Sequence, residues 1–123
     1  DRLSVSVEPY VFSLSFAGNP SAPLRTGQTR SLTLTVKDAN GRGVTTLEPL
    51  MNAFCHLVGF YDDYRTVLHL HPAGGDVVNP ELRGGPALGF QFHAPQPGFI
   101  RLYAQCRIGG RMVFAPFNPN VLP

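Results

Sequence analysis

Three histidines, His56, His69 and His71, lie close together in the sequence and are the side chains best suited to chemistry. Neutral imidazole is the commonest protein ligand for transition metals such as copper and zinc. Two aspartates, Asp62 and Asp63, separate His56 from the other two histidines, and strand-like residues flank them on both sides. Aspartates between two such runs predict the turn of a β-hairpin.

The register of this hairpin determines which histidines face each other. A two-residue turn at 62–63 places His56 opposite His69, whereas a four-residue loop over 62–65 places it opposite His71. Both registers keep the three histidines on one face, because side chains alternate along a strand with a period of two. Cross-strand neighbours have Cβ atoms about 5 Å apart. We therefore predict that His56, His69 and His71 form one cluster that binds copper or zinc.

The alternative is that the three histidines are structural, either on a solvent-facing sheet or in a polar network beside the loop. The fourth histidine, His93, lies at the end of another predicted strand among prolines and is expected at the surface. The thioethers of Met51 and Met112 suit copper(I), although core packing is the usual role of methionine. Met51 is the candidate for a fourth metal ligand.

No set of residues typical of a catalytic site is present in the sequence. It lacks a Gly-x-Ser-x-Gly elbow, a phosphate-binding glycine loop and a His-Glu-x-x-His motif. Its three glutamates, Glu8, Glu48 and Glu81, have no carboxylate partner nearby in the sequence, which disfavours paired acid–base catalysis. The sequence therefore predicts a protein that is not an enzyme, with no catalytic residues and no cofactor beyond the metal ion.

Runs of alternating apolar and polar residues supply the elements that position these side chains. The clearest runs cover residues 29–38 and 100–108, and alternation of this kind indicates strands. The chain also contains 13 glycines and 12 prolines, which leave little room for helices. About eight short runs separated by turns predict an all-β, immunoglobulin-like antiparallel sandwich of about seven to nine strands. A small barrel is the alternative, and the length of 123 residues predicts a single domain over 1–123.

The charge pattern argues against two classes of partner. The formal net charge is only +2, and the arginines are scattered along the chain rather than clustered. A nucleic-acid partner is therefore not expected, since such proteins carry a concentrated basic surface. Apolar runs fall far short of the ~20 residues that span a bilayer, so direct membrane insertion is not expected either.

The two cysteines, Cys55 and Cys106, both point by strand parity to the apolar side of their strands. Those strands can be neighbours in one sheet of a sandwich, so the geometry allows a disulfide. Two buried free thiols are the alternative, because free cysteine behaves as a small apolar side chain. The spacing matches no zinc motif, and the residues after Cys106 lack the histidine and methionine of a blue-copper site.

Several motifs between residues 25 and 118 resemble a group of bacterial secreted or envelope domains similar to the YtkA-like and FixH-like immunoglobulin-type modules. The most specific are His-Leu-Val at 56–58 and His-x-His-Pro at 69–72. The resemblance implies a β-sandwich in the cell envelope, with the family's histidines at His56, His69 and His71, and it implies no established activity. Further motifs that carry it are Gly27-Gln28, the run from Val36 to Val44, Gly84-Gly85-Pro86 and Arg101-Leu102-Tyr103.

The sequence departs from this family at Cys55, where glycine is usual, and at Cys106, where an apolar residue is usual. Two cysteines that arise together at inward positions favour a disulfide between them, which also suits an oxidising compartment. The sequence thus predicts a non-catalytic periplasmic or extracellular module that binds a transition metal. The alternative function is a ligand-free immunoglobulin-like interaction or spacer domain of a larger envelope protein, with another envelope protein as its partner.

Overall fold

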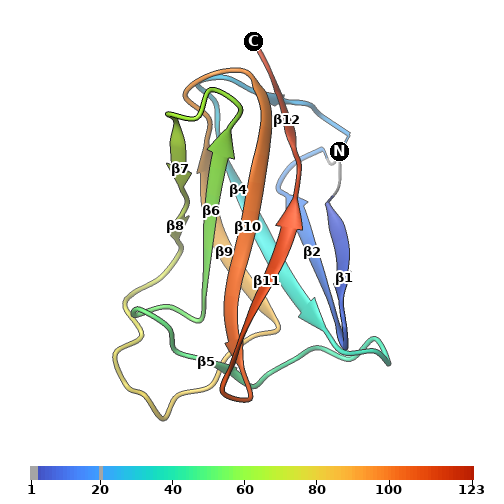
Figure 1. Cartoon of the computed structure of the whole chain (residues 1–123), viewed down its shortest axis with the longest axis vertical. Coiled ribbons are helices and arrows are strands. Elements are labelled where there is room, and N and C mark those ends of the chain that lie inside the picture. Colours follow the sequence, from blue (N-terminus) through green and yellow to red (C-terminus); the bar gives the residue numbers. More distant parts are fainter. Residues whose placement is uncertain (1–2, 20) are drawn as a thin grey trace.

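The computed structural model describes residues 3–19 and 21–123, which form two β-sheets packed face to face (Figure 1). The first is a five-stranded sheet in the order β1-β2-β4-β9-β8. Its strands are β1 (Ser4–Val7), β2 (Tyr10–Phe16), β4 (Thr29–Lys37), β9 (Ala87–His93) and β8 (His71–Pro72).

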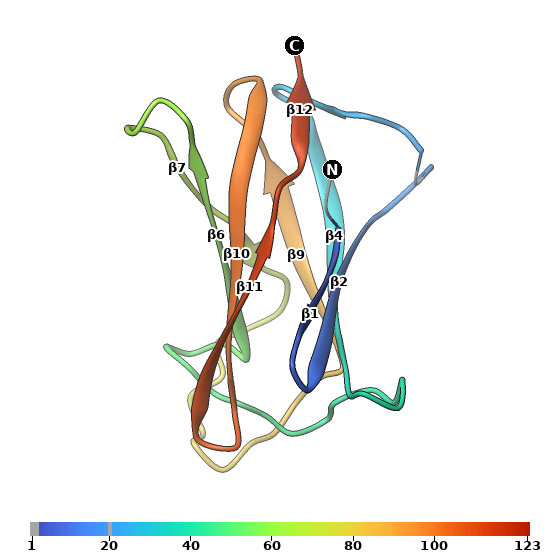
Figure 2. The same cartoon turned by 45° about the vertical axis from the view of Figure 1, so that its right-hand side comes forward.

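The second is a seven-stranded sheet in which β3, β12, β10, β6 and β7 follow one another, while β11 and β5 also pair with β10. Its strands are β3 (Leu24–Arg25), β5 (Leu47–Glu48), β6 (Cys55–Tyr61), β7 (Val67–His69), β10 (Gly98–Ile108), β11 (Arg111–Phe117) and β12 (Asn120–Leu122). Figure 2 shows the two layers from the side, with β10 and β11 to the left of β4 and β9.

The all-β sandwich predicted from the sequence is confirmed, but two details of that prediction were wrong. Twelve strands are found in the described ranges rather than seven to nine. The excess comes from strands such as β3, β5 and β8, which are two residues long and too short to show alternation. The sheets are also not wholly antiparallel, because β12 and β3 pair in parallel.

The core lies between the sheets and is built from the inward side of each alternating run. In β4, Leu32, Leu34 and Val36 are buried, while the residues between them are more exposed. Large aromatic side chains on the neighbouring strands fill the centre of this layer. No buried polar or charged residue occurs in the described part of the chain, so burial of apolar surface dominates the stability of the interior. The buried aromatic residues of the five-stranded sheet are Phe12, Phe16, Phe90 and Phe92.

Strand β10 is the central strand of the seven-stranded sheet. It pairs with β6 and β5 on one side, and with β12 and β11 on the other. The tight turn from β10 to β11 is formed by Gly109 and Gly110, both at positive φ. A two-residue hairpin loop of this kind requires positive φ at both positions, which glycine adopts without steric cost.

The two cysteines form a disulfide between β6 and β10. Cys55 and Cys106 are directly opposite in the register of these strands, and their Cα atoms are 4.5 Å apart. Both side chains are buried on the inward face. The predicted pairing is therefore confirmed, and the alternative of two free thiols is excluded.

The hairpin predicted around Asp62 and Asp63 is present, but its second strand is divided between the two sheets. Strand β7 pairs with β6 in the register that places His69 opposite Val58, which corresponds to the longer of the two loops considered from sequence. At Leu70 the chain leaves the seven-stranded sheet, and β8 pairs with β9 in the five-stranded sheet. The chain therefore crosses between the sheets directly after His69.

Candidate functional site

His56 lies on the outward side of β6 and makes a hydrogen bond within its own region of the chain. Its Nε2 atom is 2.5 Å from the carbonyl oxygen of Leu50, in the loop that precedes β6. A carbonyl oxygen only accepts hydrogen bonds, so Nε2 carries the proton and donates it. Nε2 therefore has no lone pair for a metal ion, and in this tautomer Nδ1 is the His56 atom that could ligate one.

The structure does not gather the three histidines into the predicted cluster. His69 shares the outward face of the hairpin with His56, but His71 pairs with Gln91 in the other sheet. No group of three or more His, Cys, Asp or Glu residues within 3–19 and 21–123 is placed to hold a metal ion. The parity argument failed for His71 because it assumed one continuous strand, whereas the chain changes sheets at Leu70. Copper or zinc binding through this set therefore lacks an assembled site.

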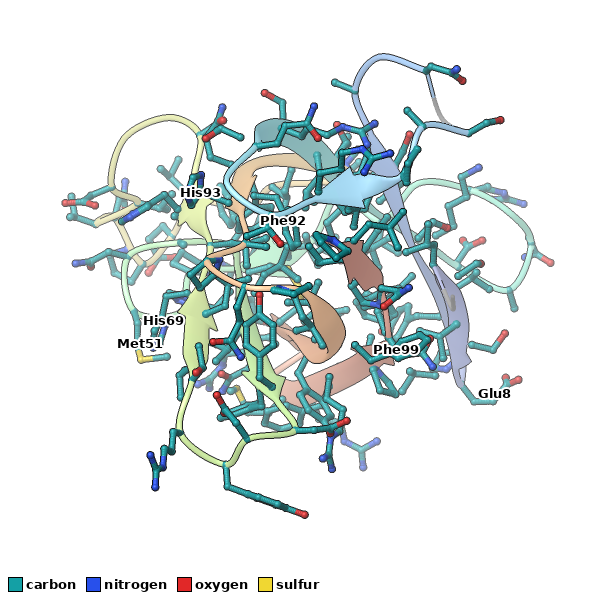
Figure 3. The ribbon with its side chains drawn as sticks, turned by 90° about the horizontal axis from the view of Figure 1, so that it is seen from above. Glu8, Met51, His69, Phe92, His93 and Phe99 are labelled. Atoms are coloured by element: carbon teal, nitrogen blue, oxygen red, sulfur yellow. A yellow bond between two sulfur atoms is a disulfide. The ribbon has the colours of Figure 1, made fainter. Side chains whose placement is uncertain are left out.

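Met51 and His93 do not complete such a site either. Met51 lies in the loop between β5 and β6 and is largely exposed. His93 lies at the end of β9, where its Nδ1 atom is 2.9 Å from the hydroxyl of Thr29. Figure 3 shows His93 and His69 well apart from one another. The surface position expected for His93 is confirmed.

Exposed aromatic residues lie on the outward face of the seven-stranded sheet, and the group of three that lies on neighbouring strands around Tyr103 is called the aromatic face. They are Phe60 on β6, Tyr103 on β10 and Phe114 on β11. The Phe60 and Tyr103 rings meet edge to face with centroids 6.2 Å apart. Phe114 pairs with Gln105, two residues along β10 from Tyr103, so the two aromatics are diagonal neighbours. Phe60 is 43% exposed and Phe114 53%.

One end of the aromatic face is hollowed into a groove of about 470 Å³ beside the β6–β7 loop, which we call the hairpin groove. The tip of the loop is Tyr64, whose side chain is 92% exposed and whose φ of 58° is unusual for a residue other than glycine. The side chains of the groove that bear on its chemistry are Phe60, Tyr64, Arg65, Val67, Arg101 and Tyr103.

The charged side chains around the hairpin groove differ in whether they have a partner. Asp63 accepts hydrogen bonds from the hydroxyl and backbone N–H of Thr66, from the backbone N–H of Arg65 and from the amide of Gln96. These bonds, that of the Thr66 hydroxyl foremost, hold the pKa of Asp63 well below its usual range. Asp62 forms an ion pair with Arg101 at 2.8 Å, which raises the pKa of that arginine. Within the described chain, the Arg65 guanidinium has no acidic partner.

The aromatic face was not predicted from the sequence, where the search for a site was confined to metal ligands and catalytic motifs. A usable signal was nevertheless present. In β6, the alternation that buries Leu57 and Tyr61 places Phe60 on the outward side, and the alternation in β10 does the same for Tyr103. Aromatic residues at the polar positions of two strands are typical of binding surfaces.

Comparison with known proteins supports the fold. Among solved structures, the chain is similar to a DUF4426 family protein from Pseudomonas aeruginosa PAO1, with a TM-score of 0.62 and 12% sequence identity. The match covers 99% of this chain and 95% of that chain, and at this identity it shows a shared fold alone. The sequence matches no curated protein. No helical segment of the described chain is long and apolar enough to cross a membrane.

A protein-family model matches nearly the whole length of the sequence. The matched residues are 7–122, and the family is described as a domain of unknown function, DUF8832. The resemblance to YtkA-like and FixH-like modules stays a prediction. The match spans every strand from β2 to β12 and includes the aromatic face and the disulfide. The chain therefore belongs to the DUF8832 family.

Proposed function

We propose that this chain is a non-catalytic protein-interaction module that works outside the cytoplasm and uses the aromatic face to contact its partner. The observation that carries the proposal is the group formed by Phe60, Tyr103 and Phe114, which are solvent-exposed on three adjacent strands. Aromatic side chains contribute large contact areas at protein interfaces, where they are enriched relative to the rest of the surface.

The disulfide supports the proposed location. Disulfides persist in oxidising compartments such as the periplasm and the extracellular space, and they are rare in the cytosol. The bond between Cys55 and Cys106 is buried in the core, so reductants reach it only when the fold opens. This placement fits a structural crosslink rather than an exposed redox-active pair.

Site-specific photocrosslinking in the envelope of the native host tests the proposal. Replacing Phe60 or Phe114 by p-benzoylphenylalanine keeps an aromatic ring at each position and should give a discrete crosslinked protein adduct on irradiation. The matched control is Val78, which is 73% exposed but lies in the loop between β8 and β9, away from the face. The same replacement there should give no such adduct.

Dependence on a second residue of the face distinguishes specific contact from accidental capture. The adduct formed from position 60 should disappear when Tyr103→Glu is added, because a carboxylate at the neighbouring position disrupts an apolar contact. An adduct that forms equally from position 78, or one that survives Tyr103→Glu, argues against the proposal.

Metal titration tests the competing function, a copper or zinc module. Isothermal titration of the oxidised protein with copper(II), copper(I) and zinc should show no binding tighter than about millimolar, because His71 lies in the other sheet and the described residues hold no group of three ligands placed around one ion. His69→Ala should leave the titration unchanged. Micromolar binding that His69→Ala abolishes would instead establish the metal function and overturn the proposal of a purely protein-binding module.

A further inference from the structure

Strand β7 is an open edge of the seven-stranded sheet, beside the hairpin groove. Among the strands of the described residues it pairs with β6 alone, and it lies on the left side of the molecule in Figure 1. Backbone bonds join Tyr61 to Thr66 and Leu57 to Leu70 across the hairpin. Since bonded and non-bonded pairs alternate along an antiparallel ladder, the N–H and C=O groups of Val67 and His69 point away from β6.

Two features show that this edge is accessible. The Val67 side chain is 49% exposed, and His69 is exposed as well. No protein group within 3–19 and 21–123 forms a ladder with the outer side of β7. Exposed strand edges pair readily with other extended chains, and proteins usually protect them with charge, proline or a bulge. The three residues of β7 itself, Val-Leu-His, contain neither proline nor a lysine.

The charge beside this edge indicates which chain fits it. Both charged residues that line the hairpin groove are arginines, Arg65 and Arg101. Asp62 already pairs with Arg101, and the oxygens of Asp63 accept hydrogen bonds from the turn and from Gln96. The Arg65 guanidinium is left to pair with a carboxylate from outside. Arginine donates several hydrogen bonds in a fixed geometry that matches carboxylate oxygens.

We infer that β7 binds an extended acidic peptide of a partner protein, which adds to the sheet as an eighth strand and places a carboxylate against Arg65. This inference rests on the proposed interaction function and names the chemistry of the partner. Addition of a strand to an open edge derives affinity from main-chain hydrogen bonds and specificity from alternate side chains. Here the outward side chains of the peptide meet Arg65 and Val67, while its inward side chains face the apolar interior.

A second copy of this chain is a poorer occupant of the same edge. Pairing of β7 with β7 would bring residues 65–72 of the two copies together, and this segment contains no aspartate or glutamate. A second copy therefore supplies no carboxylate for Arg65, and it adds the imidazoles of His69 and His71 instead. An acidic peptide satisfies both the backbone groups of the edge and the guanidinium.

A fluorescein-labelled heptapeptide of alternating valine and aspartate residues tests the inference by fluorescence anisotropy. Its period of two places every aspartate on one side of the extended chain and every valine on the other. Saturable binding to the oxidised protein is expected in the micromolar to millimolar range. The same peptide with lysine in place of aspartate should bind at least about tenfold more weakly, since it places like charge beside Arg65.

Backbone methylation of the peptide separates strand addition from simple charge attraction without altering the protein. Methylating the aspartate nitrogens blocks antiparallel addition, whereas methylating the valine nitrogens blocks parallel addition, because alternate N–H groups face β7. One methylated peptide should lose binding and the other should retain it. Equal binding by both methylated peptides overturns strand addition, and so does the absence of binding by the unmethylated peptide.

Two substitutions locate the site on the protein. Arg65→Glu should weaken binding of the aspartate peptide by about fivefold, the upper end of the range for an exposed ion pair. Val67→Pro removes the N–H that points away from β6 at the open edge, so it should abolish peptide binding. Val67→Thr retains this N–H, so the peptide should bind it normally. Unchanged affinity in Arg65→Glu and Val67→Pro would overturn the site, as would dimerisation of the protein through β7 in sedimentation analysis.

The peptide test and the crosslinking test can fail separately. Crosslinking from Phe60 or Phe114 without peptide binding would leave the aromatic face as the interface and reject β7 as the docking edge. Peptide binding with no crosslink from the aromatic face would reject that face as the contact surface and retain the edge.

Discussion

Removing the disulfide by the double substitution Cys55→Ala and Cys106→Ala should lower the free energy of unfolding by about 4 kcal/mol. The two cysteines are 51 residues apart in the sequence, so the bond closes a long loop and restricts the unfolded chain strongly. A change of this size in a domain of this length corresponds to a decrease in thermal midpoint of roughly 10–20 °C. Circular dichroism measures both quantities, the free energy by denaturant titration and the midpoint by a thermal scan.

Reductant provides the control for this prediction. Wild-type protein that is unfolded and refolded in excess dithiothreitol should reproduce most of the loss seen in the double variant. The double variant itself should be insensitive to reductant, because it contains no other cysteine. Equal stability of the wild type with and without reductant would contradict a stabilising role for the Cys55–Cys106 bond.

Phe92→Ala should destabilise the fold by about 3–5 kcal/mol, the cost typical of truncating a buried phenylalanine. Phe92 is 1% exposed, and its ring packs edge to face on that of Phe16 with centroids 5.4 Å apart. The Phe16 ring also lies beneath the guanidinium of Arg30 at 5.4 Å. Removal of the Phe92 ring therefore leaves a cavity and deprives Phe16 of a contact. Chemical denaturation at equilibrium gives the free-energy difference.

Phe99→Ala is the matched control, because it removes the same side chain from a solvent-facing position. Phe99 lies at the start of β10 opposite Asn120 and is 55% exposed. Its truncation should cost less than about 1 kcal/mol. Figure 3 labels both phenylalanines. Similar losses in the two variants would show that Phe92 does not pack in the core as described.

The parts of the fold that could be predicted from sequence are those where one strand buries one face over many residues. In β4 and β10 the alternation runs for nine and 11 residues, so the inward set is unambiguous. The same parity placed Cys55 and Cys106 on the inward side of their strands, and the structure pairs them. In a long half-buried strand, the alternation of apolar and polar residues shows which side faces the core.

The change of sheet at Leu70 could not be predicted in this way. Leu70 is buried and continues the apolar pattern of β7, so the sequence there shows no break. The alternation of side chains along a strand relates residues only within one sheet. His71 lies beyond the point where the chain crosses from the seven-stranded to the five-stranded sheet. The predicted cluster of His56, His69 and His71 is absent because β8 pairs with β9, a long-range pairing that no local pattern encodes.

The central position of β10 implies a gradient of local stability across the sheet. The N–H groups of β10 are bonded to strands on both of its sides, so their hydrogens exchange with solvent only when the whole domain opens. Strand β7 pairs with β6 and with no other strand of residues 3–19 and 21–123, so it can detach in a smaller, less costly opening. The slowest-exchanging amides therefore lie around the disulfide, and protection decreases outward until it is lowest at the edge inferred to receive the peptide.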